Sequence, residues 1–135
     1  MRVLVVEDDF ISRRLLCRYL QAHAECDVAV NGNEAVGAFK QSLLADQRYD
    51  LVCLDIMMPG MDGQETLKRV RALEREHGID DTDRSRVIMT TALEDHDNVL
   101  VAFSNACDGY VVKPIEKRKF LETLQEIGLP VKVHG

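Results

Sequence analysis

The sequence lacks a surplus of basic residues and long apolar runs, and each absence excludes a class of protein. Its 17 Lys and Arg against 23 Asp and Glu give a net charge of −6, which argues against direct binding to nucleic-acid phosphates. No apolar run approaches the ~20 residues that a membrane-spanning helix needs. No signal-peptide pattern precedes the first strand-like run. We therefore expect a cytoplasmic protein without membrane insertion.

The few cysteines and histidines show no spacing typical of a disulfide framework or a metal site. Cys17, Cys26, Cys53 and Cys107 are scattered, without a C-x-x-C pair, and each lies within an apolar pattern. We interpret them as small core residues. The four histidines have no ligand spacing with one another or with the cysteines, which argues against a zinc site.

Five short apolar runs alternate with helical patterns along the chain. The runs at 3–6 and 51–54 predict buried strands. Those at 87–89 and 109–112 also predict strands, and the pattern at 26–30 is a weaker indication of one. Apolar spacing between them predicts helices at about 10–22, 31–43, 62–77 and 95–105, and a last one that ends before Gly128. In the first helix, Ile11, Leu15 and Tyr19, with Leu16 and Leu20, are predicted to face the core. The alternation predicts a flavodoxin-like α/β fold, a (βα)5 doubly wound parallel five-stranded sheet in the order 2-1-3-4-5.

The chain has the size and composition of one globular domain. It has 135 residues, of which 46% are hydrophobic and 30% are charged, as is usual for a single folded unit. The last helical pattern stops at Gly128. We predict a domain over residues 1–128 and a short C-terminal tail over 129–135, with no output domain.

Polar side chains follow four of the five predicted strands. Glu7 and Asp8 follow the first strand, and Asp55, Thr91 and Lys113 follow the third, fourth and fifth. Because the carboxyl ends of parallel strands meet at one edge of a sheet, these groups are expected to lie together. Considered alone, Asp55 is equally well explained as a turn residue.

Clustered carboxylates need a compensating cation to stay ionised at neutral pH. Oxygen ligands without His or Cys favour a hard ion, and Mg²⁺ with retained waters suits an open site of this kind. The sequence has no twelve-residue calcium-loop pattern. A carboxylate beside Mg²⁺, with an ammonium and a hydroxyl aimed at the same point, is suited to accept a phosphoryl group.

Four motifs carry a resemblance to a known family. They are residues 5–8 (VVED), 54–63 (LDIMMPGMDG), 91–92 (TA) and 109–114 (GYVVKP). Each is weak alone, but in this order and at strand ends they are specific. Across nearly its whole length the sequence resembles the receiver domain of two-component response regulators.

The resemblance implies a role for each residue of the predicted site. It implies that Asp55 is the phosphorylated residue and that Lys113 pairs with the phosphoryl oxygens. It also implies that Asp8 binds Mg²⁺ directly, that Glu7 binds it through water, and that the backbone carbonyl of Met57 completes the protein ligands.

The resemblance also implies a conformational switch. Thr91 would hydrogen-bond a phosphoryl oxygen in the active state, and Tyr110 would turn inward as Thr91 moves. The peptide bond between Lys113 and Pro114 would be cis. Simpler explanations exist for each: Thr91 as a strand-end residue, Tyr110 as an edge aromatic and Lys113 as a surface lysine.

The function implied is that of a single-domain response regulator. A sensor histidine kinase would phosphorylate Asp55, and the fourth helix, fifth strand and fifth helix would form a docking surface for a downstream protein. The alternative is a phosphorelay intermediate that passes the group to a histidine phosphotransfer protein. Phosphorylation-dependent homodimerisation is also possible under either role.

We expect no enzymatic activity beyond phosphoryl acceptance and slow self-dephosphorylation. Met57 and Leu93, two residues after Asp55 and Thr91, are apolar and offer no group to orient a water. A haloacid-dehalogenase-type phosphohydrolase would be expected to carry an acidic residue where Met57 stands. A flavodoxin-like FMN carrier would need a phosphate-binding loop of Ser, Thr and Gly at residues 7–9, where the chain has three acids.

Overall fold

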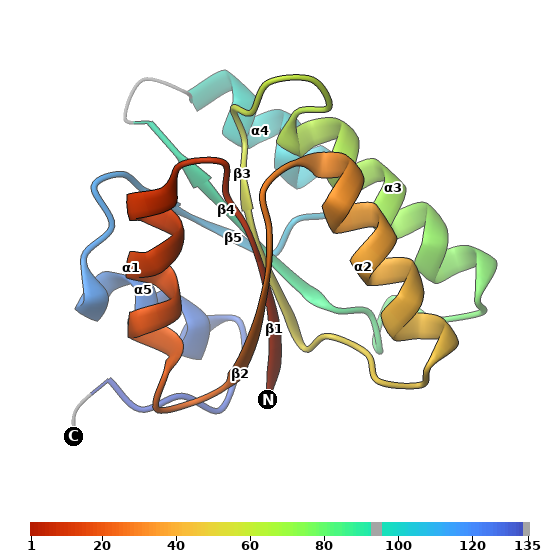
Figure 1. Ribbon diagram of the computed structural model, residues 1–135, viewed down its shortest axis with the longest axis horizontal. Coiled ribbons are helices and arrows are strands. Elements are labelled where there is room, and N and C mark those ends of the chain that lie inside the picture. Colours follow the sequence, from red (N-terminus) through yellow and green to blue (C-terminus); the bar gives the residue numbers. More distant parts are fainter. Residues whose placement is uncertain (93–95, 134–135) are drawn as a thin grey trace.

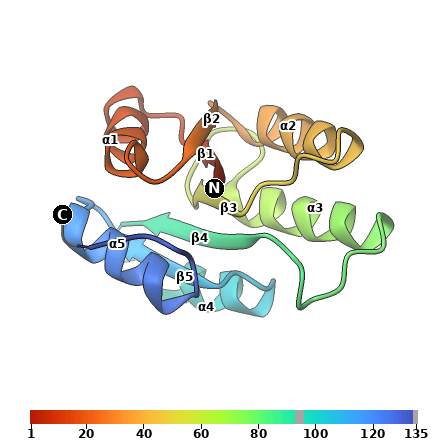
Figure 2. The same cartoon turned by 90° about the horizontal axis from the view of Figure 1, so that it is seen from below.

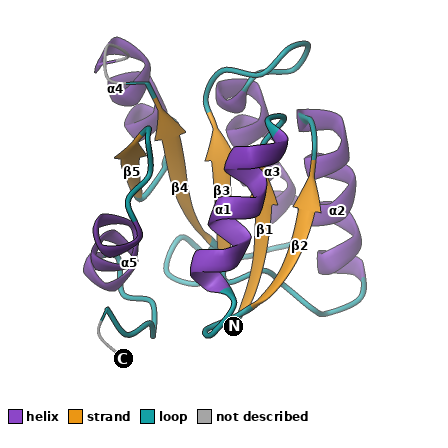
Figure 3. Ribbon diagram, turned by 60° about the vertical axis from the view of Figure 1, so that its left-hand side comes forward, coloured by secondary structure: helices purple, strands orange, loops and turns teal. Residues whose placement is uncertain are grey.

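A computed structural model describes residues 1–92 and 96–133, which form a parallel sheet with helices on both faces (Figure 1). The strands are β1 (Arg2–Val6), β2 (Glu25–Ala29), β3 (Leu51–Asp55), β4 (Arg86–Thr91) and β5 (Gly109–Val112). All neighbouring pairs are parallel, in the order β2-β1-β3-β4-β5. The predicted fold and strand order are therefore confirmed, and β1 and β3 lie side by side (Figure 3).

The helices divide into two layers. They are α1 (Phe10–Leu20), α2 (Gly32–Leu44), α3 (Gly63–Glu76), α4 (His96–Ser104) and α5 (Lys117–Glu126). Helices α1 and α5 pack on one face of the sheet, and α2, α3 and α4 pack on the other (Figure 2). The central strand β3 is buried along its whole length, as expected for a strand covered on both faces.

Side-chain caps fix where three helices begin. The carboxylate of Asp9 accepts a hydrogen bond from the Ser12 amide at 2.9 Å, which begins α1 directly after the acidic pair. Asn31 and Asp62 cap α2 and α3 in the same way. Asp9 thus belongs to a helix cap, and each cap satisfies an amide that the helix leaves unpaired.

The prediction for the buried face of α1 is wrong in part. Leu16 and Leu20 are buried against β1 and β3, but Ile11 is 74% exposed. Ile11 shares one face of α1 with Arg14 and Arg18, three and seven residues further on, and both are also exposed, so this face points away from the sheet. Tyr19 is partly buried, and its hydroxyl donates to the carbonyl of Ile115 at 2.8 Å.

The last described residues, 127–133, pack back onto the domain. Val131 is buried, and Leu129 contacts the same core cluster as α5. The side-chain amide of Gln125 donates to the carbonyl of Val131 at 2.9 Å. Within the described ranges, no helix has the length and apolar character needed to span a membrane.

Candidate functional site

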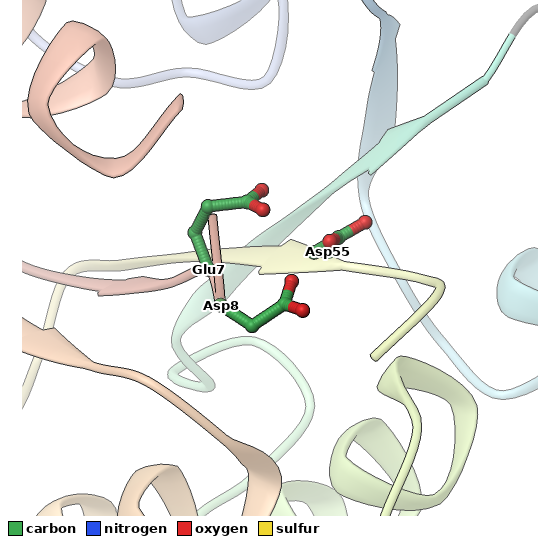
Figure 4. Close-up of side chains that lie close together, drawn as sticks. All are labelled: Glu7, Asp8 and Asp55. Carbon is green, nitrogen blue, oxygen red and sulfur yellow. The ribbon is translucent and has the colours of Figure 1, made fainter. Parts of the chain in front are cut away.

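Three carboxylates meet at the carboxyl edge of the sheet, between β1 and β3. Each of Glu7, Asp8 and Asp55 offers an oxygen atom within 4.8 Å of those of the other two (Figure 4). The register explains this, because Val6 pairs with Leu54 and the acidic residues follow directly. Glu7 and Asp55 are buried and Asp8 is exposed. The site therefore opens to solvent on the Asp8 side.

Lys113 supplies the positive charge of the site from the far side of β4. Its Nζ lies 3.1 Å from Glu7 Oε2 and 3.3 Å from Asp55 Oδ2. Lys113 follows β5, so its side chain crosses the β4 position to reach β3 and β1. The interpretation of Lys113 as a surface lysine is therefore wrong. One ammonium compensates only part of the charge of three carboxylates.

The pKa values of these groups reflect that imbalance. Burial first, and then the neighbouring Asp55, raise the pKa of Glu7 to about 7. Burial also raises the pKa of Asp55, against the opposing effect of Lys113. Burial lowers the pKa of Lys113, but the two carboxylates raise it by more, so it stays protonated. At neutral pH Glu7 is therefore only partly ionised, and the site favours an added cation.

The donor atoms fit a hard divalent ion. All three side chains offer oxygen, and Glu7 Oε2, which has the Lys113 ammonium at 3.1 Å, receives no well-aligned hydrogen bond from any residue that the structure describes. Such an unsatisfied buried oxygen is stabilised by a metal ligand bond or a water. Oxygen ligands with an open side suit Mg²⁺. The Met57 amide donates to Asp55 Oδ1 at 3.3 Å, and the role of the Met57 carbonyl stays a prediction.

Among the described residues, no hydrogen bond joins Thr91 or Tyr110, the predicted switch residues, to Asp55. Thr91 is buried, and its hydroxyl donates to the carbonyl of Ala92 at 3.2 Å. The Tyr110 ring is 43% exposed and packs edge-on against Phe103 of α4, with centroids 6.2 Å apart. The Lys113–Pro114 peptide is cis, in agreement with the expectation.

Two residues near Asp55 were missed by the sequence analysis. Gly63 begins α3, and a Cβ on it would lie 2.2 Å from the carbonyl oxygen of Asp55. Thr90, which pairs with Asp55 in the sheet, is fully buried. The signals were a glycine after the Asp62 cap and a hydroxyl inside an apolar strand run. Leu93, predicted to affect dephosphorylation, lies outside the described residues.

Comparison with known proteins gives a consistent family. The family model described as the response regulator receiver domain matches residues 3–125. Regulatory protein VanRB of Enterococcus faecalis is 37% identical over 128 residues, which are 94% of this chain and 52% of that protein. Transcriptional regulatory protein ResD of Bacillus subtilis is 34% identical over 87% of this chain and 44% of its own. The chain thus spans about half the length of these curated relatives.

Solved structures are similar over nearly the whole chain. Chemotaxis protein CheY4 of Vibrio cholerae has 27% identity and a TM-score of 0.78, over 93% of this chain and 97% of its own. CheY in the CheX–CheY–BeF₃–Mg²⁺ complex of Borrelia burgdorferi has 26% identity and a TM-score of 0.82, over 96% and 90%. The likeness therefore covers nearly the whole fold.

Proposed function

Because the chain belongs to the family of response regulator receiver domains, we propose that it accepts a phosphoryl group on Asp55 from a sensor histidine kinase. One observation carries the proposal: Lys113 and the Glu7, Asp8 and Asp55 carboxylates, from three strand ends, converge on one point. An aspartate that only formed a turn would not be expected to lie beside two further carboxylates and an ammonium. The phosphorylated domain then signals through a protein-docking surface.

The side chains have complementary parts in the transfer. An Asp55 carboxylate oxygen attacks phosphorus, the P–N bond to the donor histidine breaks, and the departing imidazole nitrogen accepts a proton. Lys113 pairs with a phosphoryl oxygen, since its ammonium already lies 3.3 Å from Asp55. Glu7, Asp8 and Asp55, with the Met57 carbonyl, would hold Mg²⁺, which neutralises phosphoryl charge. The Borrelia neighbour, solved with BeF₃ and Mg²⁺, supports this assignment.

The docking surface proposed is the face formed by α4, β5 and α5. Leu100, Val101, Phe103 and Tyr110 are large apolar residues exposed there. Thr91 would turn toward a phosphoryl oxygen and allow Tyr110 to leave its contact with Phe103. The partner would be a downstream protein or a histidine phosphotransfer protein, and a second copy of the phosphorylated chain would use the same face. This signalling would take place in the cytoplasm.

We also propose that the domain turns over no other substrate and loses its phosphoryl group slowly. The Met57 side chain, next to the acceptor, is apolar and 63% exposed, so it cannot orient a water. The half-life of phosphorylated protein, isolated and kept in Mg²⁺, measures this. A half-life of seconds would contradict the proposal.

Intact-protein mass spectrometry after incubation with acetyl phosphate and Mg²⁺ tests the proposed function. We expect one added phosphoryl mass, lost in Asp55→Asn and in a chelated sample. Asp81→Asn, in an exposed loop away from the site, is the matched control and should still be phosphorylated. An adduct that persists in Asp55→Asn would overturn the assignment.

Absence of any adduct on folded wild-type protein would be resolved by beryllofluoride. Binding at Asp55, read from chemical-shift changes with Mg²⁺ present, would mean that transfer requires the specific kinase. No binding would mean a receiver domain that signals without phosphate, and the proposal would then be wrong.

A further inference from the structure

Thr90 occupies the place that the Lys113 side chain must cross. Thr90 pairs with Asp55 on one side and with Val111 on the other, so the side chains of all three point to the same face of the sheet. Lys113 lies two residues beyond Val111 and therefore shares that face. Because Lys113 reaches the two carboxylates from β5, its chain passes over Thr90 on β4.

The Thr90 hydroxyl is unsatisfied. The residue is fully buried, and Oγ1 has no hydrogen-bond partner among the residues that the structure describes. A buried hydroxyl without a partner is destabilising, and valine has the same shape without that penalty. A threonine at this position therefore suggests a partner that arrives in another state of the site.

Cation binding would supply that partner. The Lys113 ammonium lies 3.1 Å from Glu7 Oε2, an oxygen of the three-carboxylate cluster. A divalent cation bound to the same oxygens would repel the ammonium and remove its Glu7 partner. An ammonium that withdraws along its own chain toward β4 meets Thr90, and each of its three N–H groups needs an acceptor.

We propose that Thr90 is a positioning residue of the acidic site, whose hydroxyl accepts a hydrogen bond from the Lys113 ammonium when a divalent cation displaces it from Glu7. The hydroxyl then holds Lys113 beside Asp55, ready for a phosphoryl oxygen. The contact between Thr90 and Lys113 is inferred from the geometry alone. Its role in phosphoryl transfer rests on the proposed function.

Mg²⁺ affinity, measured by titration calorimetry without any phosphoryl donor, tests the contact. Thr90→Val should bind Mg²⁺ about tenfold more weakly, the factor expected for one hydrogen bond to a charged group. Thr90→Ser keeps the hydroxyl and should retain most of the affinity. In metal-free buffer, Thr90→Val should unfold at the same or a higher urea concentration than wild type. A purely structural role for the hydroxyl would instead lower that unfolding midpoint.

A double-mutant cycle assigns the effect to Lys113. In a Lys113→Met background, Thr90→Val should leave Mg²⁺ affinity unchanged, because the ammonium is gone. Unchanged affinity of Thr90→Val in the wild-type background would overturn the proposal, as would an equal loss in both backgrounds. If Thr90→Val does not fold, Thr90→Ala serves in the same cycle.

The phosphorylation assay keeps this result separate from the proposed function. If the wild type accepts phosphate and Thr90→Val equals it in Mg²⁺ affinity and phosphorylation rate, the role of Thr90 is refuted and the proposed function stands. If the wild type neither accepts phosphate nor binds beryllofluoride, but the double-mutant cycle couples Thr90 to Lys113 in Mg²⁺ affinity, the proposed function is refuted and the role of Thr90 stands.

Discussion

Two buried clusters of charged side chains lie at opposite ends of the sheet, and they differ in how completely their hydrogen bonds are satisfied. The acidic site lies at the carboxyl edge. The second, here called the Arg71 cluster, consists of Arg71 and Glu74 on α3 with Asp108 before β5. Ser85 joins it at the start of β4.

Each charged atom of the Arg71 cluster has a partner. Arg71 Nη1 donates to Glu74 Oε1 at 2.7 Å, and Nη2 donates to Asp108 Oδ2 at 3.1 Å. Nε and Nη2 also donate to the carbonyl of Ala106. The Ser85 amide donates to Glu74 Oε2 at 2.7 Å, and Arg84 Nη2 donates to Asp108 Oδ1 at 3.2 Å. This cluster joins α3 to the starts of β4 and β5, and its charged side-chain atoms are all paired within the cluster and its neighbours.

The acidic site is incomplete by the same measure. Within the described part of the chain, Glu7 Oε2 has the Lys113 ammonium at 3.1 Å but no well-aligned hydrogen bond, and Thr90 Oγ1 has no partner. The pKa of Glu7 is raised to about 7. Burial without full pairing is unfavourable for folding and is typical of functional sites. The comparison teaches that satisfaction of hydrogen bonds, more than burial of charge, separates the structural cluster from the functional one.

The largest expected effect comes from breaking the satisfied cluster. Arg71→Met would leave the buried Glu74 without its cation, and Arg84 as the remaining cation on the partly buried Asp108. We therefore expect a loss of about 3–5 kcal/mol in the free energy of unfolding. Urea unfolding measures it. Phosphorylation per folded molecule should stay unchanged, since the cluster lies at the other end of the sheet. A loss below about 1 kcal/mol would mean that the cluster is not structural.

Glu7→Gln should raise the free energy of unfolding, by less than Arg71→Met lowers it. The pKa of Glu7 is raised from 4.5 to about 7 on folding. Its contribution to stability is therefore fully present below about pH 4.5 and lost as the pH rises through about 7. In EDTA, Glu7→Gln should be more stable than wild type by about 2–3 kcal/mol at pH 8, with no difference near pH 4.5.

Unfolding curves at several pH values, each in EDTA, check this. Asp81→Asn, with an exposed side chain, is the matched control and should follow the wild-type pH dependence. Equal pH dependence of unfolding in Glu7→Gln and wild type would contradict the assignment of the raised pKa to Glu7.

The smallest effect is expected for an exposed ion pair. Arg118 and Glu122 on α5 approach to 2.8 Å, but both are largely in solvent. Arg118→Ala should change the free energy of unfolding by no more than about 0.5 kcal/mol. The same urea titration measures it and provides a scale for the Arg71 result. A loss as large as that of Arg71→Met would show that burial is irrelevant to these pairs.

The sequence alone determined the fold and the main members of the acidic site. Apolar runs and helical spacing are local patterns, so they identify strands and helices without tertiary information. Parallel strands bring their carboxyl ends to one edge, which is why Glu7, Asp55 and Lys113 could be grouped before their contacts were known. The family motifs added the expected role for each.

Only the tertiary structure decided which groups are satisfied and which are not. Ile11 matches a helical stripe, yet it lies on the outer face of α1 with Arg14 and Arg18 and is exposed. Thr90 reads as one more residue of a buried strand until its register beside Asp55 and the path of Lys113 are known. The Arg71 cluster joins residues from three separated segments. Hydrogen-bond satisfaction depends on side chains that meet across elements, and local sequence patterns do not encode those meetings.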